Sequence, residues 1–190
     1  MPSEVFALDL EDGRPIWVRT LPSPTIRRPL AAFGAILVAL TDGLVLLDAA
    51  SGDTMTAWSW PNSIVGDVAT GPKVAFAVRC GKEDSIFNGK RAVIPRECWI
   101  VRLNPNGSLQ WERESVLRGP RIVWDAARGC LLEACRGLGV WEVDEGRRKH
   151  LIPLSDIEGH LTPAIDADRI YMTSTDGSIL AFRSPLLPTE

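Results

Sequence analysis

The feature that most constrains the fold of this chain is a unit of about forty residues that recurs along it. Each unit has an apolar run, a polar turn with a glycine, and a second run. The apolar residue just before each turn is, in order, Leu8, Leu47, Leu103, Val143 and Phe182, at spacings of 39, 56, 40 and 39 residues. The surplus in the one long spacing lies between Cys80 and Cys98. Such a period predicts a repeat architecture.

The segments within each unit are typical of short strands. Residues 35–49 read "AILVAL", "TDG" and "LVLLDA", which is a strand, an Asp-Gly turn and a second strand. No segment keeps a helical spacing of apolar residues over twelve positions, and 14 prolines and 16 glycines interrupt the chain. Four short antiparallel strands per unit are typical of the blades of a β-propeller, which stack around an axis. The sequence therefore predicts an all-β fold with almost no helix.

The first unit contains the pattern Ala7-x-Asp9-x-x-x-Gly13-x-x-x-Trp17. This pattern resembles the docking motif of the PQQ-like β-propeller repeats, a family that includes the quinoprotein alcohol dehydrogenases and the propeller lipoprotein of outer-membrane barrel assembly. The resemblance implies that the alanine and the tryptophan of neighbouring blades lock together. It also implies that the glycine makes the turn between the third and fourth strands. A ring of this size fills the wedge between two blades.

Later units keep parts of this motif. The second unit has its tryptophan shifted to Trp58, the third has one residue fewer before its glycine, and the fourth has His150 where the tryptophan is expected. The fifth keeps Ala181. The expected blade-docking residues are Ala7, Asp9, Gly13, Trp17, Asp48, Gly52, Trp58, Gly107 and Trp111.

The units predict one propeller segment over residues 1–190. We expect a partial blade at 1–20, full blades at about 26–60, 64–114 and 119–153, and a partial blade at 160–184. Because this is about four blades, the chain is expected to form an open arc or part of a larger propeller. It is then either a fragment or a chain whose copies associate to complete a ring. Open strand edges would serve a protein partner or self-association.

The overall composition excludes some classes of partner. The net charge is −3 and the isoelectric point is about 5.5, so we expect no nucleic-acid binding. No apolar stretch approaches the roughly 20 residues of a membrane span. The first residues show no signal peptide, so the chain as it stands is expected in the cytoplasm. A fragment of a longer exported protein would instead be extracytoplasmic, and the localisation stays open.

The four cysteines predict no metal site, because they show no C-x-x-C spacing and only two histidines accompany them. The favoured interpretation is that all four are buried or half-buried thiols. The alternative concerns Cys80 and Cys98, which bracket the insertion: they would face each other across a hairpin and form a disulfide if the compartment is oxidising.

The insertion "GKEDSIFNGKRAVIPRE" at residues 81–97 places Asn-Gly between two strand-like runs, which is the strongest short signal for a hairpin. One interpretation is a recognition finger with Ile86, Phe87 and Lys90 at its tip. The other is a surface insertion without a function, since such insertions cost little stability.

This hairpin is expected on the same face as the loops that enter the innermost strands. These loops hold Arg27, Arg28, Asp67, Arg118, Arg121 and His160. At the mouth of a channel they would bind an anionic ligand or a partner segment. The alternative is a set of separately solvated charges on different blades. The candidate binding residues are therefore Arg28, Asp67, Ile86, Phe87, Lys90, Arg121 and His160.

The sequence contains no established catalytic or phosphate-binding motif. Asp166 and Asp168 read as a turn between two strands rather than as a cation site. The leading hypothesis is a non-catalytic scaffold that contacts another protein, with no cofactor expected. The alternative is a fragment of a quinoprotein-type dehydrogenase, which would bring PQQ and calcium. The resemblance implies a pair of adjacent cysteines in such enzymes, and this chain has no Cys-Cys pair.

Overall fold

A computed structural model describes residues 3–87, 90–154, 162–166, 169–173 and 177–183 of the chain. Every regular element in these residues is a β-strand, and the strands pair antiparallel in chain order into five separate sheets. No helix in this part of the chain is long and apolar enough to span a membrane.

The five sheets are numbered here in chain order. Sheet 1 contains β1 (Ser3–Leu8) and β2 (Pro15–Leu21), and sheet 2 contains β3 (Leu30–Ala32), β4 (Ala35–Leu40), β5 (Gly43–Leu47) and β6 (Thr54–Ser59). Sheet 3 contains β7 (Ser63–Gly71), β8 (Val74–Phe87), β9 (Lys90–Leu103) and β10 (Leu109–Ser115). Sheet 4 contains β11 (Arg121–Asp125), β12 (Cys130–Ala134), β13 (Gly137–Glu142) and β14 (Arg147–Pro153), and sheet 5 contains β15 (Thr162–Ile165), β16 (Arg169–Thr173) and β17 (Ile179–Arg183).

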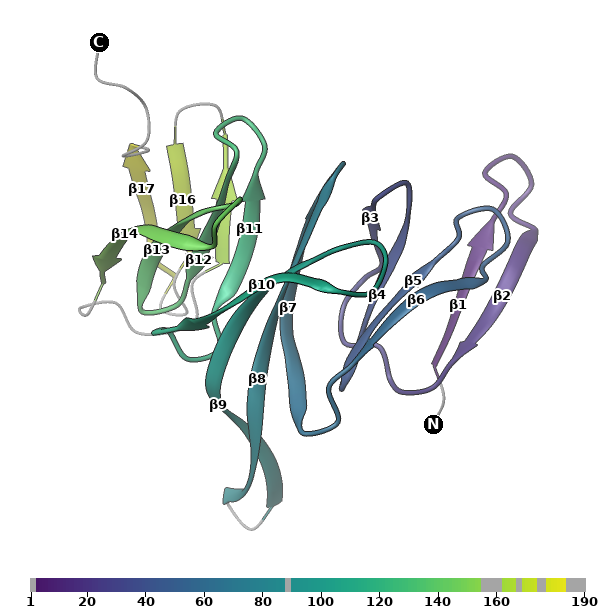
Figure 1. Cartoon of the computed structure of the whole chain (residues 1–190), viewed down its shortest axis with the longest axis horizontal. Helices are drawn as coiled ribbons and strands as arrows, with labels where there is room; N and C mark the ends of the chain where they lie inside the picture. Colours follow the sequence, from purple (N-terminus) through teal and green to yellow (C-terminus); the bar gives the residue numbers. More distant parts are fainter. Residues whose placement is uncertain (1–2, 88–89, 155–161, 167–168, 174–176, 184–190) are drawn as a thin grey trace.

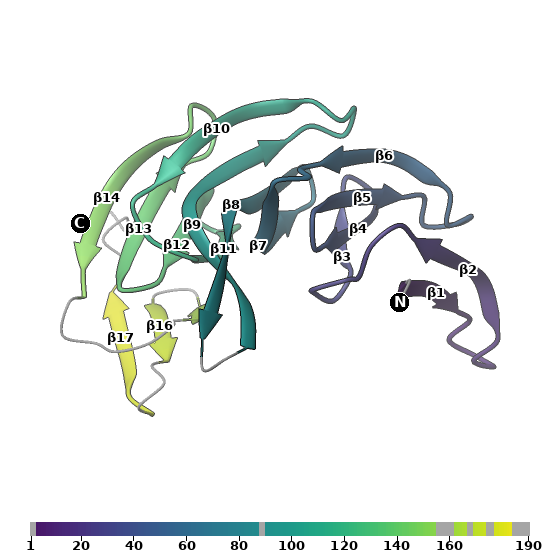
Figure 2. The ribbon, with the colours of Figure 1, turned by 90° about the horizontal axis from the view of Figure 1, so that it is seen from below.

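The sheets lie side by side in an arc, with sheet 1 at one end and sheet 5 at the other (Figures 1 and 2). In Figure 2 the fourth strands β6, β10 and β14 run along the outer rim, while β3, β7 and β11 lie on the inner side. The inner strands contact one another directly, β7 with both β3 and β11, and β11 with β15. The chain is thus an all-β partial propeller, and the predicted fold class is confirmed.

The middle strands of sheet 2, β4 and β5, are apolar along their whole length, and both of their faces are buried. Successive residues of a strand point to opposite faces of its sheet. In β4, Leu37 and Ala39 pack into the seam between sheets 2 and 3, whereas Val38 and Leu40 pack into the seam between sheets 1 and 2. Each of the four seams holds one such hydrophobic cluster. The core is therefore a series of wedges between neighbouring sheets.

One hairpin projects from the arc. Strands β8 and β9 each have 14 residues and stay paired out to Phe87 and Lys90, so they extend well beyond the rest of sheet 3 (Figure 1). This is the hairpin that the Asn-Gly signal predicts. We call the part from Cys80 to Cys98 the finger.

Candidate functional site

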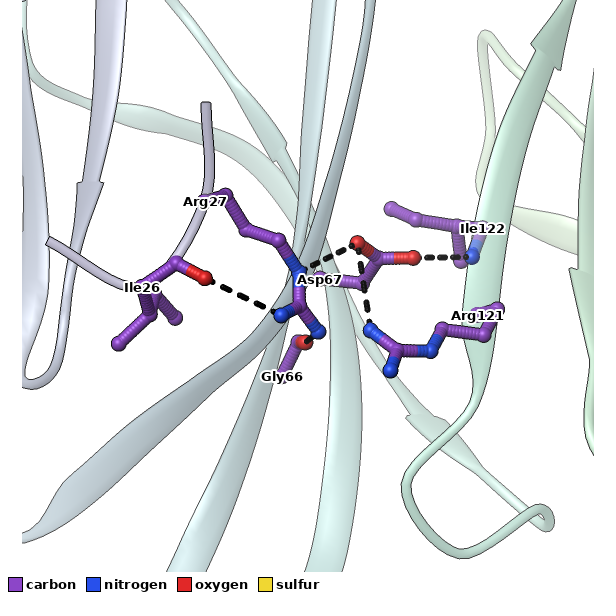
Figure 3. A network of polar contacts seen from close by, with 6 residues as sticks. All are labelled: Ile26, Arg27, Gly66, Asp67, Arg121 and Ile122. Carbon is purple, nitrogen blue, oxygen red and sulfur yellow. Dashed lines mark hydrogen bonds and ion pairs between the residues drawn. The ribbon is translucent and has the colours of Figure 1, made fainter. Parts of the chain in front are cut away.

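Asp67 lies where three sheets meet, next to a bulge in β7 that interrupts the pairing between Val65 and Asp67. Arg27, from the connection into β3, donates from Nε to Asp67 Oδ1 over 3.2 Å (Figure 3). Arg121, at the start of β11, places Nη1 3.8 Å from the same oxygen. The backbone N–H of Ile122 donates to Asp67 Oδ2 over 3.0 Å. One carboxylate thus links sheets 2, 3 and 4.

The guanidinium of Arg27 is fixed by two further bonds. Its Nη2 donates to the carbonyl of Gly66 over 2.7 Å and its Nη1 to the carbonyl of Ile26 over 3.1 Å (Figure 3). A side chain held in this way loses little additional freedom when a ligand binds, which favours binding. The cluster is therefore preorganised.

The charges at this point are unequal. The guanidiniums of Arg27 and Arg121 both approach the one carboxylate of Asp67, and Arg28 lines the same cleft as Asp67. Burial raises the pKa of Asp67 above its ordinary value, although the hydrogen bond from Ile122 and the charge of Arg27 act in the opposite direction. An excess of positive charge remains, and it favours an anionic group at this site.

Arg27, Arg28 and Asp67 line a cleft of about 310 Å³, which we call the central cleft. Its walls are formed by Arg27, Arg28, Leu30, Asp67, Val68, Ala69, Thr70, Ile122, Val123 and Trp124. Trp124 is half-buried and provides a flat apolar surface beside the charged groups. Apolar walls with a few convergent polar groups are typical of binding sites. The arrangement suits an extended peptide segment with an acidic side chain.

A larger cleft of about 530 Å³ lies at the base of the finger. Glu83, Arg96 and Glu97 line it from the finger, and Glu114 and Arg118 line it from β10 and the connection into β11. Arg96 forms two hydrogen bonds of 2.5 Å with Glu83, so the positive charge of Arg96 is already compensated. We call this the finger cleft. It carries no excess of positive charge, and Arg118 belongs to it rather than to the central cleft.

Cys80 and Cys98 form a disulfide at the base of the finger, with their Cα atoms 4.0 Å apart. The backbone N–H of Gly119 approaches Cys98 Sγ to 3.3 Å, so the connection into β11 lies directly against this bridge. Cys130 and Cys135 are free and buried. Burial raises the pKa of the Cys130 thiol to about 11, which keeps it protonated and unreactive at neutral pH.

The structure separates the candidate binding residues into two groups. Arg28 and Asp67 line the central cleft, and Arg121 lies beside it, 3.8 Å from Asp67. Ile86, Phe87 and Lys90 lie at the tip of the finger, where Phe87 pairs with Lys90 and the side chain of Ile86 is 75% exposed. Ile86 is eight residues along β8 from Val78, the partner of Asp67, which corresponds to about 26 Å of strand. His160 lies outside the described residues.

Five of the expected blade-docking residues lie in the seams between sheets, namely Trp17, Gly52, Trp58, Gly107 and Trp111, whereas Asp9 and Gly13 are exposed. Trp17 donates from Nε1 to the carbonyl of Ala49 over 3.0 Å, and a Cβ at Gly52 would lie 2.6 Å from its ring. Ala7 is the cross-strand neighbour of Trp17 in the same hairpin, where its small side chain leaves the ring space. Asp9 accepts a hydrogen bond from the backbone of its own turn, and so does Asp48.

The same contact recurs in two other seams. Trp111 donates to the carbonyl of Val143 over 2.7 Å and its ring covers Gly146. In the seam between sheets 2 and 3, Thr56 takes the place of the tryptophan. Its hydroxyl donates a hydrogen bond to the carbonyl of Pro105 over 3.1 Å, and its side chain lies against Gly107. Trp58 is buried two residues farther along, in the hydrophobic cluster of that seam.

A buried carboxylate in sheet 4 is not identified by the sequence patterns. Glu133 is fully buried in β12, within hydrogen-bond distance of Ser115 Oγ, and accepts a bond from Trp141 Nε1 over 2.7 Å. Burial raises its pKa, against the lowering effect of the two hydrogen bonds and of Arg148. The sequence signal that could have identified it is a single glutamate in the otherwise apolar segment Cys130–Ala134. In the described part of the chain, no three metal-binding side chains gather in one place.

Comparison with known proteins gives one family and several structures. The family model described as "Outer membrane protein assembly factor BamB" matches residues 1–184. The computationally designed Ika4 protein is similar in fold, with a TM-score of 0.63, 9% identity, and coverage of 86% of this chain and 92% of that one. No match is found among curated proteins.

Two natural structures align over more of the chain but superpose less well. BamB from Moraxella catarrhalis has a TM-score of 0.35 and 14% identity, over 95% of this chain and 78% of that one. A protein of unknown function from Bacteroides caccae has a TM-score of 0.38 and 14% identity, over 95% and 86% of the two chains.

Proposed function

Because this chain belongs to the family described as outer membrane protein assembly factor BamB, we propose that it is a non-catalytic scaffold that binds a segment of another protein in the central cleft. The family description names an assembly factor, and assembly requires contact with a partner protein. The observation that carries the proposal for this chain is the convergence of Arg27, Asp67 and Arg121 from three sheets. A cluster fixed in this way presents a defined pattern of charge to a partner.

The partner segment is acidic. Asp67 carries one negative charge against the two guanidiniums that pair with it, so positive charge on Arg121 beside the cleft and on Arg28 in its wall remains for carboxylates of the ligand. Trp124 lies in the same wall and supplies a surface for an apolar or aromatic neighbour of the acidic residue. The finger, with exposed Ile86 near its tip, provides a second contact outside the cleft.

Site-specific photo-crosslinking in the native cell tests this function. A photo-reactive residue in place of Thr70, which lines the central cleft, is expected to capture a discrete partner protein. The Arg28→Ala/Arg121→Ala double variant should lose this product, whereas Arg183→Ala, an exposed arginine on β17, should keep it. A product that persists at full yield in the double variant would overturn the assignment of the cleft. Turnover of an alcohol in the presence of PQQ and calcium would favour the dehydrogenase alternative instead.

A further inference from the structure

Glu133 is a buried carboxyl whose hydrogen bonds reach the wall of the finger cleft. It is 0% exposed in β12, opposite Gly139 of β13. A Cβ on Gly139 would lie 2.9 Å from Glu133 Oε2, so the glycine leaves room for the carboxyl. Glu133 Oε1 is within hydrogen-bond distance of Ser115 Oγ at the end of β10. Ser115 begins the stretch 115–118 that lines the finger cleft, which we call the wall segment. A carboxyl of sheet 4 is thus attached to this wall.

The hydroxyl of Ser115 has two acceptors and one proton. The backbone N–H of Leu117 donates to Ser115 Oγ over 2.9 Å, and the same oxygen lies 2.9 Å from the carbonyl of Leu117. Glu133 Oε1 is the second acceptor. Because a hydroxyl donates only one hydrogen bond, Ser115 serves either the carbonyl of Leu117 or an ionised Glu133, and not both.

The protonation state of Glu133 decides which acceptor receives this proton. A neutral carboxyl donates to Ser115 Oγ, and the hydroxyl proton is then available for the carbonyl of Leu117. An ionised carboxylate has no proton to donate, so it takes the hydroxyl proton and the carbonyl of Leu117 loses its bond. The bond of 2.7 Å from Trp141 Nε1 to Glu133 Oε2 is compatible with both states. The two states therefore differ in the bond that holds the wall segment.

The groups that face Glu133 accommodate both states. On the two strands paired with β12, Ile122 and Gly139 oppose Glu133, and neither side chain titrates. Burial raises the pKa of Glu133, whereas Arg148 on β14 lowers it. The guanidinium carbon of Arg148 lies 5.5 Å from the ring centroid of Trp141, and its buried Nη1 has no hydrogen-bond partner within the described structure. Arg148 thus supplies a positive charge and an unused donor for an ionised Glu133.

From this arrangement we propose that the proton on Glu133 is a pH-dependent switch for the wall segment of the finger cleft. With the proton in place, Ser115 holds the carbonyl of Leu117 and the wall is fixed. Without it, this carbonyl turns to solvent and the cleft changes shape. The carbonyl of Arg118 keeps its own bond from Cys135 Sγ over 3.2 Å, so the change is confined to the start of the wall segment. The proposal goes beyond the function proposed above, because it concerns the finger cleft and not the central cleft.

An NMR titration of the full chain from about pH 4 to about pH 9 tests the switch. The carboxyl carbon signal of Glu133 reports its ionisation, and the amide nitrogen signal of Arg118 reports the hydrogen bond at the preceding carbonyl of Leu117. Both signals are expected to change with one midpoint, which lies above the ordinary pKa of 4.5. Two different midpoints, an Arg118 signal that ignores pH, or a Glu133 that never ionises in this range would overturn the proposal.

A matched pair of glutamine variants assigns the titrating group. In Glu133→Gln the amide NH₂ donates to Ser115 at every pH, so the Arg118 signal should lose its titration and stay where it is in protonated wild type. Glu114→Gln is the control, because it removes an exposed carboxyl of the same cleft and should leave the titration intact. A titration that persists in Glu133→Gln, or that disappears in Glu114→Gln, would belong to another group and contradict the proposal.

Ser115→Ala separates a relay through the hydroxyl from a direct effect of charge. The variant keeps Glu133 and Arg148, so the carboxyl still ionises, but the Arg118 signal should no longer follow it. A response of unchanged size would show that the charge alone moves the signal and would overturn the relay. Should Ser115→Ala fail to fold, the wild-type and glutamine titrations decide the proposal without it. The Arg28→Ala/Arg121→Ala variant of the central cleft should keep the switch, so the two proposals fail independently.

Discussion

The contact between Trp17 and Gly52 depends on the absence of a side chain on the glycine. A Cβ at this position would lie 2.6 Å from two atoms of the indole ring, and the φ of 73° is one that other residues adopt only with strain. The glycine therefore serves both the turn and the seam. The indole gains a flat backbone surface and a hydrogen bond to the carbonyl of Ala49 at the same time.

We expect Trp17→Ala to lower the free energy of unfolding by about 3–5 kcal/mol, because it removes a large ring from a packed seam. Trp17→Phe keeps most of the apolar surface and loses the hydrogen bond, so it should cost about 1 kcal/mol of that bond plus a smaller packing loss. Urea unfolding followed by circular dichroism measures both. A loss below about 0.5 kcal/mol for Trp17→Ala would mean that the ring does not hold the seam together.

Glu133 shows how a buried acid is accommodated in an apolar seam. Its two oxygens face Ser115 Oγ and Trp141 Nε1, and Ser115 Oγ also lies 2.9 Å from the carbonyl of Leu117. If Ser115 donates to Leu117, one oxygen of Glu133 has to donate to Ser115, which requires a protonated carboxyl. This hydrogen-bond pattern agrees with the raised pKa. A glutamine amide fits the same partners, with its NH₂ facing Ser115.

We therefore expect Glu133→Gln to be at least as stable as wild type at pH 7, by up to about 1 kcal/mol. The folded state holds the proton of Glu133 to a higher pH than the unfolded state does. The contribution of protonated Glu133 to the free energy of unfolding is thus fully present at low pH, and it is lost as the pH rises through the raised pKa of this carboxyl. The difference between variant and wild type should shrink from pH 7 to pH 4 in urea titrations. A variant that is strongly destabilised at pH 7 would contradict this assignment.

At the scale of the elements, the finger depends on a bridge at its base. The disulfide joins β8 and β9 where the hairpin leaves sheet 3, across a separation of 18 residues. Beyond Gly81 on β8 and Cys98 on β9, the hairpin has no further sheet partner in the described residues. A covalent link at the base therefore compensates for the missing neighbours, and it also fixes the wall that the finger contributes to the finger cleft.

The Cys80→Ala/Cys98→Ala variant should lose about 3 kcal/mol of stability, as expected for a loop of this length. Reductant added during urea unfolding should lower the midpoint of wild type towards that of the double variant. The same reductant should leave the variant unchanged, which serves as the internal control. Equal midpoints for oxidised wild type and the variant would show that the bridge does not stabilise the finger.

The elements were largely predictable from the sequence, whereas the site was predictable only in part. Strand positions follow from the alternation of apolar residues and from turn glycines, both of which are local signals. Local sequence does not tell which side chain packs against the turn glycine of the next sheet. By residue type the expected side chain is Trp58, but it is Thr56, four residues after Gly52, that lies against Gly107. Likewise the pairing of Asp67 with Arg27 depends on how three sheets stack, which no single repeat encodes.

At the scale of the whole molecule, the sheets form a linear stack, and in the described part of the chain each sheet makes its main contacts with its immediate neighbours. Sheets 2, 3 and 4 each have hydrophobic clusters on both faces, whereas sheets 1 and 5 each have a cluster on one face only within the described residues. In such stacks the stability is approximately a sum of the terms for each unit and each interface. The end sheets therefore have the fewest stabilising contacts and should open first.

Hydrogen exchange measured by mass spectrometry tests this order directly. We expect the slowest exchange in β4, β5, β12 and β13 and in residues 74–80 of β8, because these segments are paired on both sides and buried in two seams. Exchange should be at least tenfold faster in β1 and β17, which lie in the end sheets and pair with one strand each in the described structure. Trp17→Ala should speed exchange in sheet 1 and leave sheet 4 unchanged, because no seam connects those two sheets directly. Uniform protection across all five sheets, lost together in one step, would instead require strong cooperativity along the whole arc and would contradict the additive picture of its stability.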